Sequence, residues 1–354
     1  MTQTNSVPDM LDLLSQPAFY VKDNEIVRVN QAASQLQLQP GMQVSRLLLT
    51  GSDEYPTFEG GELYLTLKAA DIPQGAIVTR IDGYDVFLLE AQHELSELHA
   101  MSLAAQELRN PLSTISAVAD RLFSSLPAEY AGAAEAQIAQ LNRSLYQMLR
   151  LVNNMSSAER YSKKTSVPKE TCNIHAFFSE LFEAAAASTA QGGRTLICRG
   201  LDKDLFCLIN KELMERAFYN LLSNAIKFSP VGSVLSVSLS RRKNKLYLTM
   251  ENTADDHTGG HFFDSFLREP GILDGRCGIG LGMVLVRAAA ASHGGTVLVE
   301  QTSAATKITL SLLISQQTES TVSSPVLRVD YAGERDHRLL ELSDALPADA
   351  YKNI

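Results

Sequence analysis

The chain has no long run of apolar residues, and no stretch approaches the roughly 18 uninterrupted apolar residues that a membrane span needs. The N-terminus, MTQTNSVPDMLDLL, lacks the basic region followed by an apolar region that marks a signal peptide. The four cysteines, Cys172, Cys198, Cys207 and Cys277, form no CxxC pair and are typical of reduced cytosolic thiols. These absences predict a cytoplasmic protein with no membrane span.

Positive charge is in the minority, and the net charge is -9 at pH 7. A phosphate backbone would be repelled, so we expect no nucleic-acid partner. No sequence repeat is found, and no pair of histidines has metal-ligand spacing on a helix. The length of 354 residues exceeds what one small core needs, which favours two or three domains.

Residues 1–90 have the pattern of a small mixed α/β domain. Asp82-Gly83 is a strong hairpin signal between two of its strands, and the helices between strands are short. The expected strands are AFYV (18–21), IVRVN (26–30), ELYLTL (62–67), GAIVTRI (75–81) and YDVFLLE (84–90). A single sheet with a few helices on one face should result.

Residues 91–160 carry two apolar seams with alternating spacings of four and three, separated by SSLPAEYAG. The first seam consists of Met101, Ala105, Leu108, Leu112, Ile115, Ala119 and Leu122, and the second of Ala134, Ile138, Leu141, Leu145, Met148, Val152 and Met155. A single helical hairpin buries such a stripe poorly. Two hairpins from two chains would form a four-helix bundle, so we predict a homodimer through this region.

Residues 167–315 alternate strands and helices and predict a second α/β domain. The remaining residues, 316–354, begin with a Ser/Thr-rich linker, QQTESTVSSP. They continue with one strand, VLRVDY, and one short amphipathic helix, HRLLELSDAL. We expect this tail to dock on the second α/β domain or on a partner.

The segment NLLSNAIKFSP places Asn220, Asn224 and Lys227 on one face of a helix, at i, i+4 and i+7. A carboxamide oxygen suits Mg²⁺ and a lysine ammonium suits phosphate. The alternative is a polar helix face with two ordinary asparagines.

The segment GRCGIGLGM (275–283) opens a helix with glycines that permit close backbone approach. The free N–H groups at the start of the following helix would favour phosphate. The alternative is a flexible loop that precedes a helix.

Together and in this order, the two segments resemble the N box and the G2 box of the ATP-binding domain of histidine kinases. FDSFLRE (263–269) resembles the F box of that family, and SHGG (292–295) the turn after its G2 helix. The resemblance implies an α/β sandwich that binds Mg-ATP under a mobile lid, within an α+β multidomain protein. It also implies that Asn220 ligates Mg²⁺ and that Asn224 and Lys227 face the phosphates. The phosphate loop would contain Gly278, Gly280, Leu281 and Gly282.

Two positions depart from that pattern. Asn252 stands where the G1 box has an aspartate for the adenine amino group, and glycines at the usual spacing are missing. An asparagine oxygen can still accept that hydrogen bond, but its NH₂ group needs a partner of its own. Arg216 stands where related ATPases have the glutamate that activates water, which favours phosphoryl transfer or simple binding over ATP hydrolysis.

QELRNPL resembles the H box on the first helix of the dimerisation hairpin, with Gln106 in place of the phosphoacceptor histidine. A glutamine amide is not nucleophilic at neutral pH, so autophosphorylation at this position is excluded. Glu107 and Asn110 keep an E-x-x-N pattern, which in this family orients a water that dephosphorylates the receiver domain of a response regulator. The alternative is that both residues serve packing and capping. His93 and His99 precede Gln106, but both fit a solvated linker helix better than a phosphoacceptor.

PAFYVKDNEIVRVNQAA resembles the start of a PAS domain, in which two strands lead to an asparagine that begins a helix. It implies a sensory module, although a purely structural role in dimerisation fits equally. One hypothesis is therefore a signalling protein with a PAS-like, a dimerisation and an ATP-binding domain. It would act on a receiver domain as a phosphatase or by nucleotide-gated binding. The other is a non-catalytic partner that binds a true kinase or a receiver through its helices.

Overall fold

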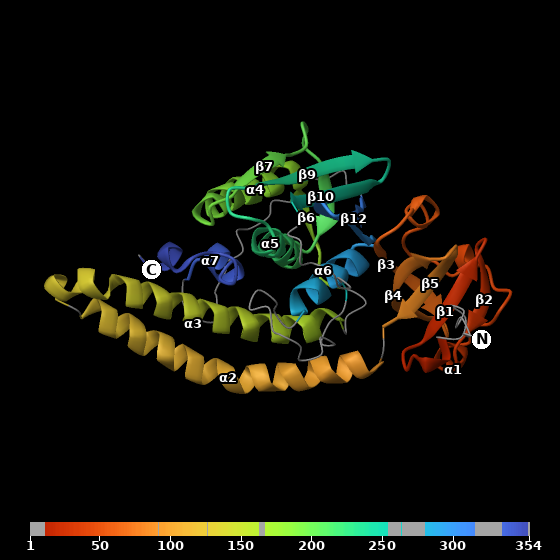
Figure 1. The fold of residues 1–354 in the computed structure, drawn as a ribbon, viewed down its shortest axis with the longest axis horizontal. Helices are drawn as coiled ribbons and strands as arrows, with labels where there is room; N and C mark the ends of the chain where they lie inside the picture. The colour runs from red at the N-terminus through yellow and green to blue at the C-terminus, as the bar shows by residue number, and fades with distance from the viewer. Residues whose placement is uncertain are drawn as a thin grey trace, which may run out of the picture.

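The computed structural model describes residues 11–90, 92–125, 127–162, 167–253, 263, 280–315 and 335–352. The fold is a mixed α/β multidomain architecture, as predicted. A long helical hairpin runs beneath the C-terminal region of sheet, and the N-terminal region of sheet lies at one end of this hairpin (Figure 1). None of the helices in these ranges has both the length and the apolar composition that a membrane crossing requires.

The N-terminal strands form an antiparallel sheet in the order β2-β1-β5-β4-β3. The five predicted strands are present, with ends that differ from the prediction by at most three residues: β1 (Ala18–Lys22), β2 (Glu25–Val29), β3 (Glu62–Ala69), β4 (Ile72–Ile81) and β5 (Tyr84–Leu89). Three short helices, α1 (Gln31–Gln35), η2 (Val44–Arg46) and η3 (Tyr55–Thr57), connect them. Asn30 begins α1 as the sequence indicates, because its side chain accepts hydrogen bonds from the N–H groups of Ala18 and Ala33.

Two long antiparallel helices, α2 (Gln92–Ser124) and α3 (Ala128–Ser162), form the predicted hairpin. Within one chain only alternate positions of the first seam are buried. Ala105, Leu112 and Ala119 are at most 6% exposed, whereas three intervening positions are about half exposed: Leu108, Ile115 and Leu122. The hairpin therefore presents an apolar stripe on its outer surface, defined by these three residues.

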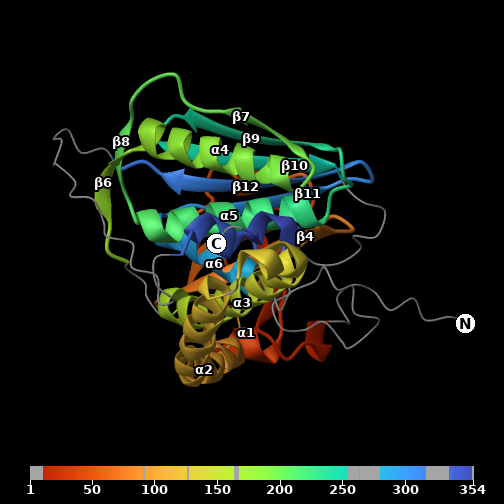
Figure 2. The same ribbon diagram turned by 90° about the vertical axis from the view of Figure 1, so that its left-hand side faces the viewer.

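The C-terminal part of the chain forms a sheet in the order β11-β12-β10-β9-β7, with only β7 and β9 parallel. Its strands are β7 (Thr195–Arg199), β9 (Val234–Arg242), β10 (Lys245–Thr253), β11 (Val297–Gln301) and β12 (Ala305–Leu313). One face packs on α4 (Ile174–Gln191), α5 (Lys211–Lys227) and α6 (Leu281–Ser292), as Figure 2 shows. Strands β6 (Glu170–Asn173) and β8 (Phe206–Ile209) pair separately.

The two regions of sheet are continuous, which the sequence does not predict. Strand β3 pairs antiparallel with β11, and the result is one sheet of ten strands. Gly61 lies at this junction, where a Cβ atom would be 2.1 Å from the carbonyl oxygen of Val299. A second contact joins the two regions, because Lys245 at the start of β10 is 2.7 Å from Glu54, the N-cap residue of the short helix η3.

The C-terminal segment, residues 335–352, contains α7 (His337–Glu341) and η4 (Ala348–Tyr351) and lies against α3 and α5 (Figures 1 and 2). The predicted helix over 337–346 is thus shorter than expected, since turns follow Glu341. The predicted strand over 326–331 lies outside the described residues. The contacts of α7 with α4 and α5 of the second α/β region agree with the expectation, whereas the more extensive contacts with α3 of the hairpin were not predicted.

Candidate functional site

Helix α5 positions the side chains of the predicted N box. Its N-terminus is capped by Asn210, whose side chain accepts from the N–H of Leu213, and most of its residues are buried. Asn220 is 2% exposed. Its Nδ2 donates to the carbonyl of Arg216, and its Oδ1 accepts from Arg150 on α3 at 3.2 Å.

The glycine segment meets α5 at Asn220. Helix α6 begins directly after Gly280, which has a φ of 81°, in the left-handed region that favours glycine. A Cβ atom at Gly282 would lie 2.6 Å from the Oδ1 of Asn220, so only glycine allows this approach. Leu281 points away and is buried with Leu98 and Ala158 of the hairpin. The two segments that the sequence pairs are therefore neighbours.

The other predicted nucleotide-binding residues are more scattered. Asn224 is half-buried, and the Nζ of Lys227 lies 3.8 Å from Asp344 of the C-terminal segment. Asn252, near the end of β10, is 7% exposed and donates to the carbonyl of Thr253. Its amide NH₂ thus has the partner that a substitution for aspartate requires. Gly278 lies outside the described residues, as does the predicted F box except Phe263.

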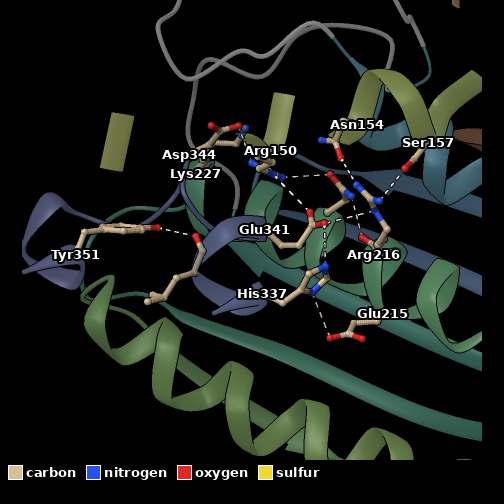
Figure 3. Close-up of polar contacts among 12 residues, drawn as sticks. Arg150, Asn154, Ser157, Glu215, Arg216, Lys227, His337, Glu341, Asp344 and Tyr351 are labelled. Carbon is tan, nitrogen blue, oxygen red and sulfur yellow. Dashed lines mark hydrogen bonds and ion pairs between the residues drawn. The ribbon is translucent and has the colours of Figure 1, made fainter. Parts of the chain in front are cut away.

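Charged side chains of α3, α5 and the C-terminal segment form a network (Figure 3), which contacts Asn220 through Arg150. Arg216 donates to Ser157 and Asn154 of α3 and lies 3.4 Å from Glu341. Arg150 lies 2.6 Å from Asp344 and 3.7 Å from Glu341, which is fully buried. Buried charges of opposite sign are thereby paired.

His337 extends this network toward α5. Its ring nitrogens lie 3.5 Å from Glu215 and 3.8 Å from Glu341. Burial lowers the pKa of His337 and the nearby Arg216 adds to that effect, but the two carboxylates outweigh them and hold the pKa above its ordinary value. The imidazolium form is therefore the one that this site favours.

The sequence predicts none of the partners Arg150, His337, Glu341 and Asp344. Apart from the i, i+4 contact between His337 and Glu341, their contacts join residues about 70 to 194 positions apart, so no local periodicity encodes them. One feature of the sequence indicates such a partner. Arg216 falls on the buried face of α5, and a buried cation requires a carboxylate from another part of the chain.

A magnesium ion does not fit at Asn220 in this arrangement, because the Oδ1 atom accepts from the Arg150 guanidinium. A cation cannot share that oxygen with a second positive charge at hydrogen-bond distance. Among the residues described, no three His, Cys, Asp or Glu side chains are grouped to hold a metal. Arg150 would have to leave before Asn220 could serve as a metal ligand.

The residues of the predicted H box lie elsewhere. Gln106, Glu107 and Asn110 are exposed on α2, while Arg109 donates to Ser156 on α3. Helix α3 lies between α2 and α5 in both views (Figures 1 and 2). The structure therefore does not bring this cluster and Asn220 together. His99 pairs with Glu159, and the side chain of His93 lies outside the described residues.

Residues 209–316 match the family described as histidine kinase-, DNA gyrase B- and HSP90-like ATPase. The chain is 25% identical over 215 residues to the probable sensor protein PcoS of Escherichia coli, covering 56% of this chain and 42% of that protein. It is also 25% identical over 234 residues to the sensor histidine kinase WalK of Bacillus subtilis, covering 62% of this chain and 37% of that protein.

Among solved structures, full-length ShkA in complex with AMPPNP is similar over 62% of this chain and 47% of that chain, with 17% identity and a TM-score of 0.49. The chain spans less than half the length of these relatives.

Proposed function

We propose that the chain binds ATP and acts on the receiver domain of a response regulator, a proposal supported by the family match over residues 209–316 and by the similarity to sensor proteins. Transfer of phosphate to its own H box is excluded by covalent chemistry, since Gln106 offers no nucleophilic nitrogen at neutral pH. The reaction that we assign to this position is instead removal of phosphate from the receiver.

The exposure of Glu107 and Asn110 together on α2 is the observation that carries this proposal. Residues at i and i+3 of a helix share a face, and both side chains are open to a partner, while Ala105 and Leu112 bury the other side of the helix. Their exposure leaves both side chains accessible to a receiver domain, as the proposed reaction requires.

In the proposed reaction, Asn110 orients a water molecule against the phosphorus of an aspartyl phosphate, and Glu107 accepts a proton from that water. The water oxygen bonds to phosphorus while the bond between phosphorus and the aspartyl oxygen breaks. Inorganic phosphate and a free aspartate are the products.

The nucleotide would bind between α5 and the start of α6. Asn224 and Lys227 would face the phosphates, Asn252 the adenine amino group, and the segment containing Gly278, Gly280, Leu281 and Gly282 the phosphate chain. Magnesium would use Asn220 only in a state in which Arg150 has released that side chain. We further assign residues 1–90 to a PAS-like sensor, 91–160 to the dimerisation hairpin, 167–315 to the ATP-binding domain and 316–354 to the tail.

The test is dephosphorylation of receiver domains charged with acetyl phosphate, followed with and without the full chain. Asn110→Ala should slow the reaction about 100-fold, since a positioned proton-transfer or water-orienting group contributes on that order. Gln140→Ala, which removes an exposed amide on α3, is the matched control and should keep the wild-type rate. Equal rates for both variants would refute a phosphatase role for Asn110.

A second candidate function is that of a non-catalytic scaffold. It is favoured by the apolar stripe of Leu108, Ile115 and Leu122, which fits a homodimer or a pairing with a true kinase, and by the contact between Arg150 and Asn220. Titration with labelled ATP and Mg²⁺ discriminates the two, because the scaffold needs no nucleotide.

A further inference from the structure

The C-terminal segment, residues 335–352, is anchored to the hairpin by specific contacts. Tyr351 is fully buried and packs edge-on against Tyr146, and its hydroxyl donates to the carbonyl of Leu339. The side chains of Arg143 and Gln147 both donate to the carbonyl of Ser343. A segment held in this way places its acidic residues at defined positions.

Two of those acidic residues enter the charge network beside Asn220 (Figure 3). Glu341 pairs with both Arg150 and Arg216. Asp344 lies 2.6 Å from the Nη1 of Arg150 and 3.8 Å from the Nζ of Lys227. Two carboxylates of the same chain therefore form ion pairs with three cations beside α5.

Arg150 connects this network to the predicted N box. The same guanidinium that contacts Asp344 donates to the Oδ1 of Asn220. Carboxylate and phosphate oxygens are interchangeable partners for guanidinium and ammonium groups. Because Arg150 and Arg216 are nearly fully buried, removal of the carboxylates would leave unpaired buried charge unless another anion replaced them.

We propose that residues 335–352 compete, within the same chain, with the phosphates of a nucleotide for the cations beside Asn220. In the docked state Glu341 and Asp344 form ion pairs with Arg150, Arg216 and Lys227. Arg150 keeps its hydrogen bond to Asn220. When the segment leaves, those cations and Asn220 become available to the phosphate chain. This inference rests on the proposed nucleotide-binding function and assigns its regulation.

The test measures binding of a fluorescent ATP analogue to the full chain by anisotropy, with and without Mg²⁺. Two kinds of variant release the site by different means. E341Q with D344N removes the competing charges, and Y351A removes the anchor while the carboxylates remain. Each variant should bind the ATP analogue about tenfold tighter than the wild type, or tighter still. The apparent affinity is proportional to the fraction of molecules from which the segment has left, and this fraction should rise from about a tenth or less toward one.

D349N is the matched control. Asp349 lies on the same segment, but its carboxylate is 77% exposed and contacts Lys352, so its removal should leave affinity unchanged. D344N alone is tested as well, since Asp344 is 37% exposed and its loss disturbs the fold less than that of buried Glu341. Thermal melts identify the variants that remain folded, and D344N alone carries the comparison if the double variant unfolds.

The outcomes separate this inference from the proposed function. Tighter binding by the charge or anchor variants, with D349N unchanged, supports competition by the segment. If the wild type and every folded variant bind the ATP analogue with the same affinity, the segment does not compete with the nucleotide, while the proposed nucleotide site stands. No binding by any folded variant, Y351A included, overturns the nucleotide site and the inference with it.

Discussion

Single buried side chains fix the junction between α5 and α6. His293, which follows α6, is 4% exposed, and its Nδ1 donates to the carbonyl of Ala289. Its Nε2 accepts from the N–H of Asn210, the residue that caps α5. An imidazole can play both parts only when it is neutral. Burial is the main reason that the pKa of His293 is lowered to about 4.

The stability of the protein should therefore fall as the pH drops from about 6.5 toward 4. Over that range the unfolded chain binds a proton at this histidine and the folded chain does not, which costs up to about 3 kcal/mol. Urea unfolding at several pH values measures the slope. H293Q should flatten it, whereas H175Q, at a 40% exposed histidine, should not. An unchanged slope in H293Q would assign the pH dependence to another group.

At the level of elements, the helical hairpin buries one side of each helix and exposes an apolar stripe on the other. The stripe recurs every seven residues at Leu108, Ile115 and Leu122, so it follows one face of the C-terminal half of α2. Leu141 and Met148 on α3 are also exposed and are spaced by seven. A second hairpin with the same pattern would bury both sets.

L108E should consequently weaken self-association, because it places a charge in the apolar contact between two hairpins. L103E is the matched control: Leu103 is equally exposed on α2, at 50% against 46%, but lies outside the seam. Light scattering after gel filtration reports the mass of each variant. A wild-type chain that is already monomeric, or equal masses for both variants, would contradict a homodimer through this stripe.

At the scale of the whole molecule, the ten-stranded sheet joins the N-terminal region directly to the region that carries Asn220. The junction consists of three paired positions between β3 and β11, supported by ion pairs of Lys245 with Glu54 and of Arg287 with Glu90. A change in the N-terminal sheet can therefore reach β11 without passing along α2.

G61A should separate β3 from β11. Gly61 has a φ of 87°, and its Cβ would collide with the carbonyl of Val299, whereas a Cβ at the neighbouring Gly60 meets nothing within 4 Å. Amide hydrogen exchange should accelerate at Val297–Val299 in G61A but not in G60A, with protection in β9 and β10 retained. Unchanged exchange at β11 in G61A would mean that the junction does not depend on this glycine.

Much of the local structure could be predicted from the sequence. The five N-terminal strands, the two seamed helices and the cap at Asn30 follow from periodicity and from the preferences of asparagine and glycine. The adjacency of Asn220 and Gly282 also agrees with the pairing of the two motifs. The exclusion of autophosphorylation at Gln106 needs no structure, since the chemistry belongs to the side chain itself.

The sequence alone thus determined the elements and the chemistry that each side chain can perform, because both depend on residues close together in the chain. Only the tertiary structure decided that β3 pairs with β11 and that Arg150 donates a hydrogen bond to Asn220. It also decided that Glu341 and Asp344 form ion pairs with Arg150. Those contacts depend on which exposed strand edges and buried charges find partners tens to hundreds of residues away. Local periodicity carries no information about which distant residues become partners. The partners follow from the energetic cost of leaving a buried charge or a strand edge unpaired.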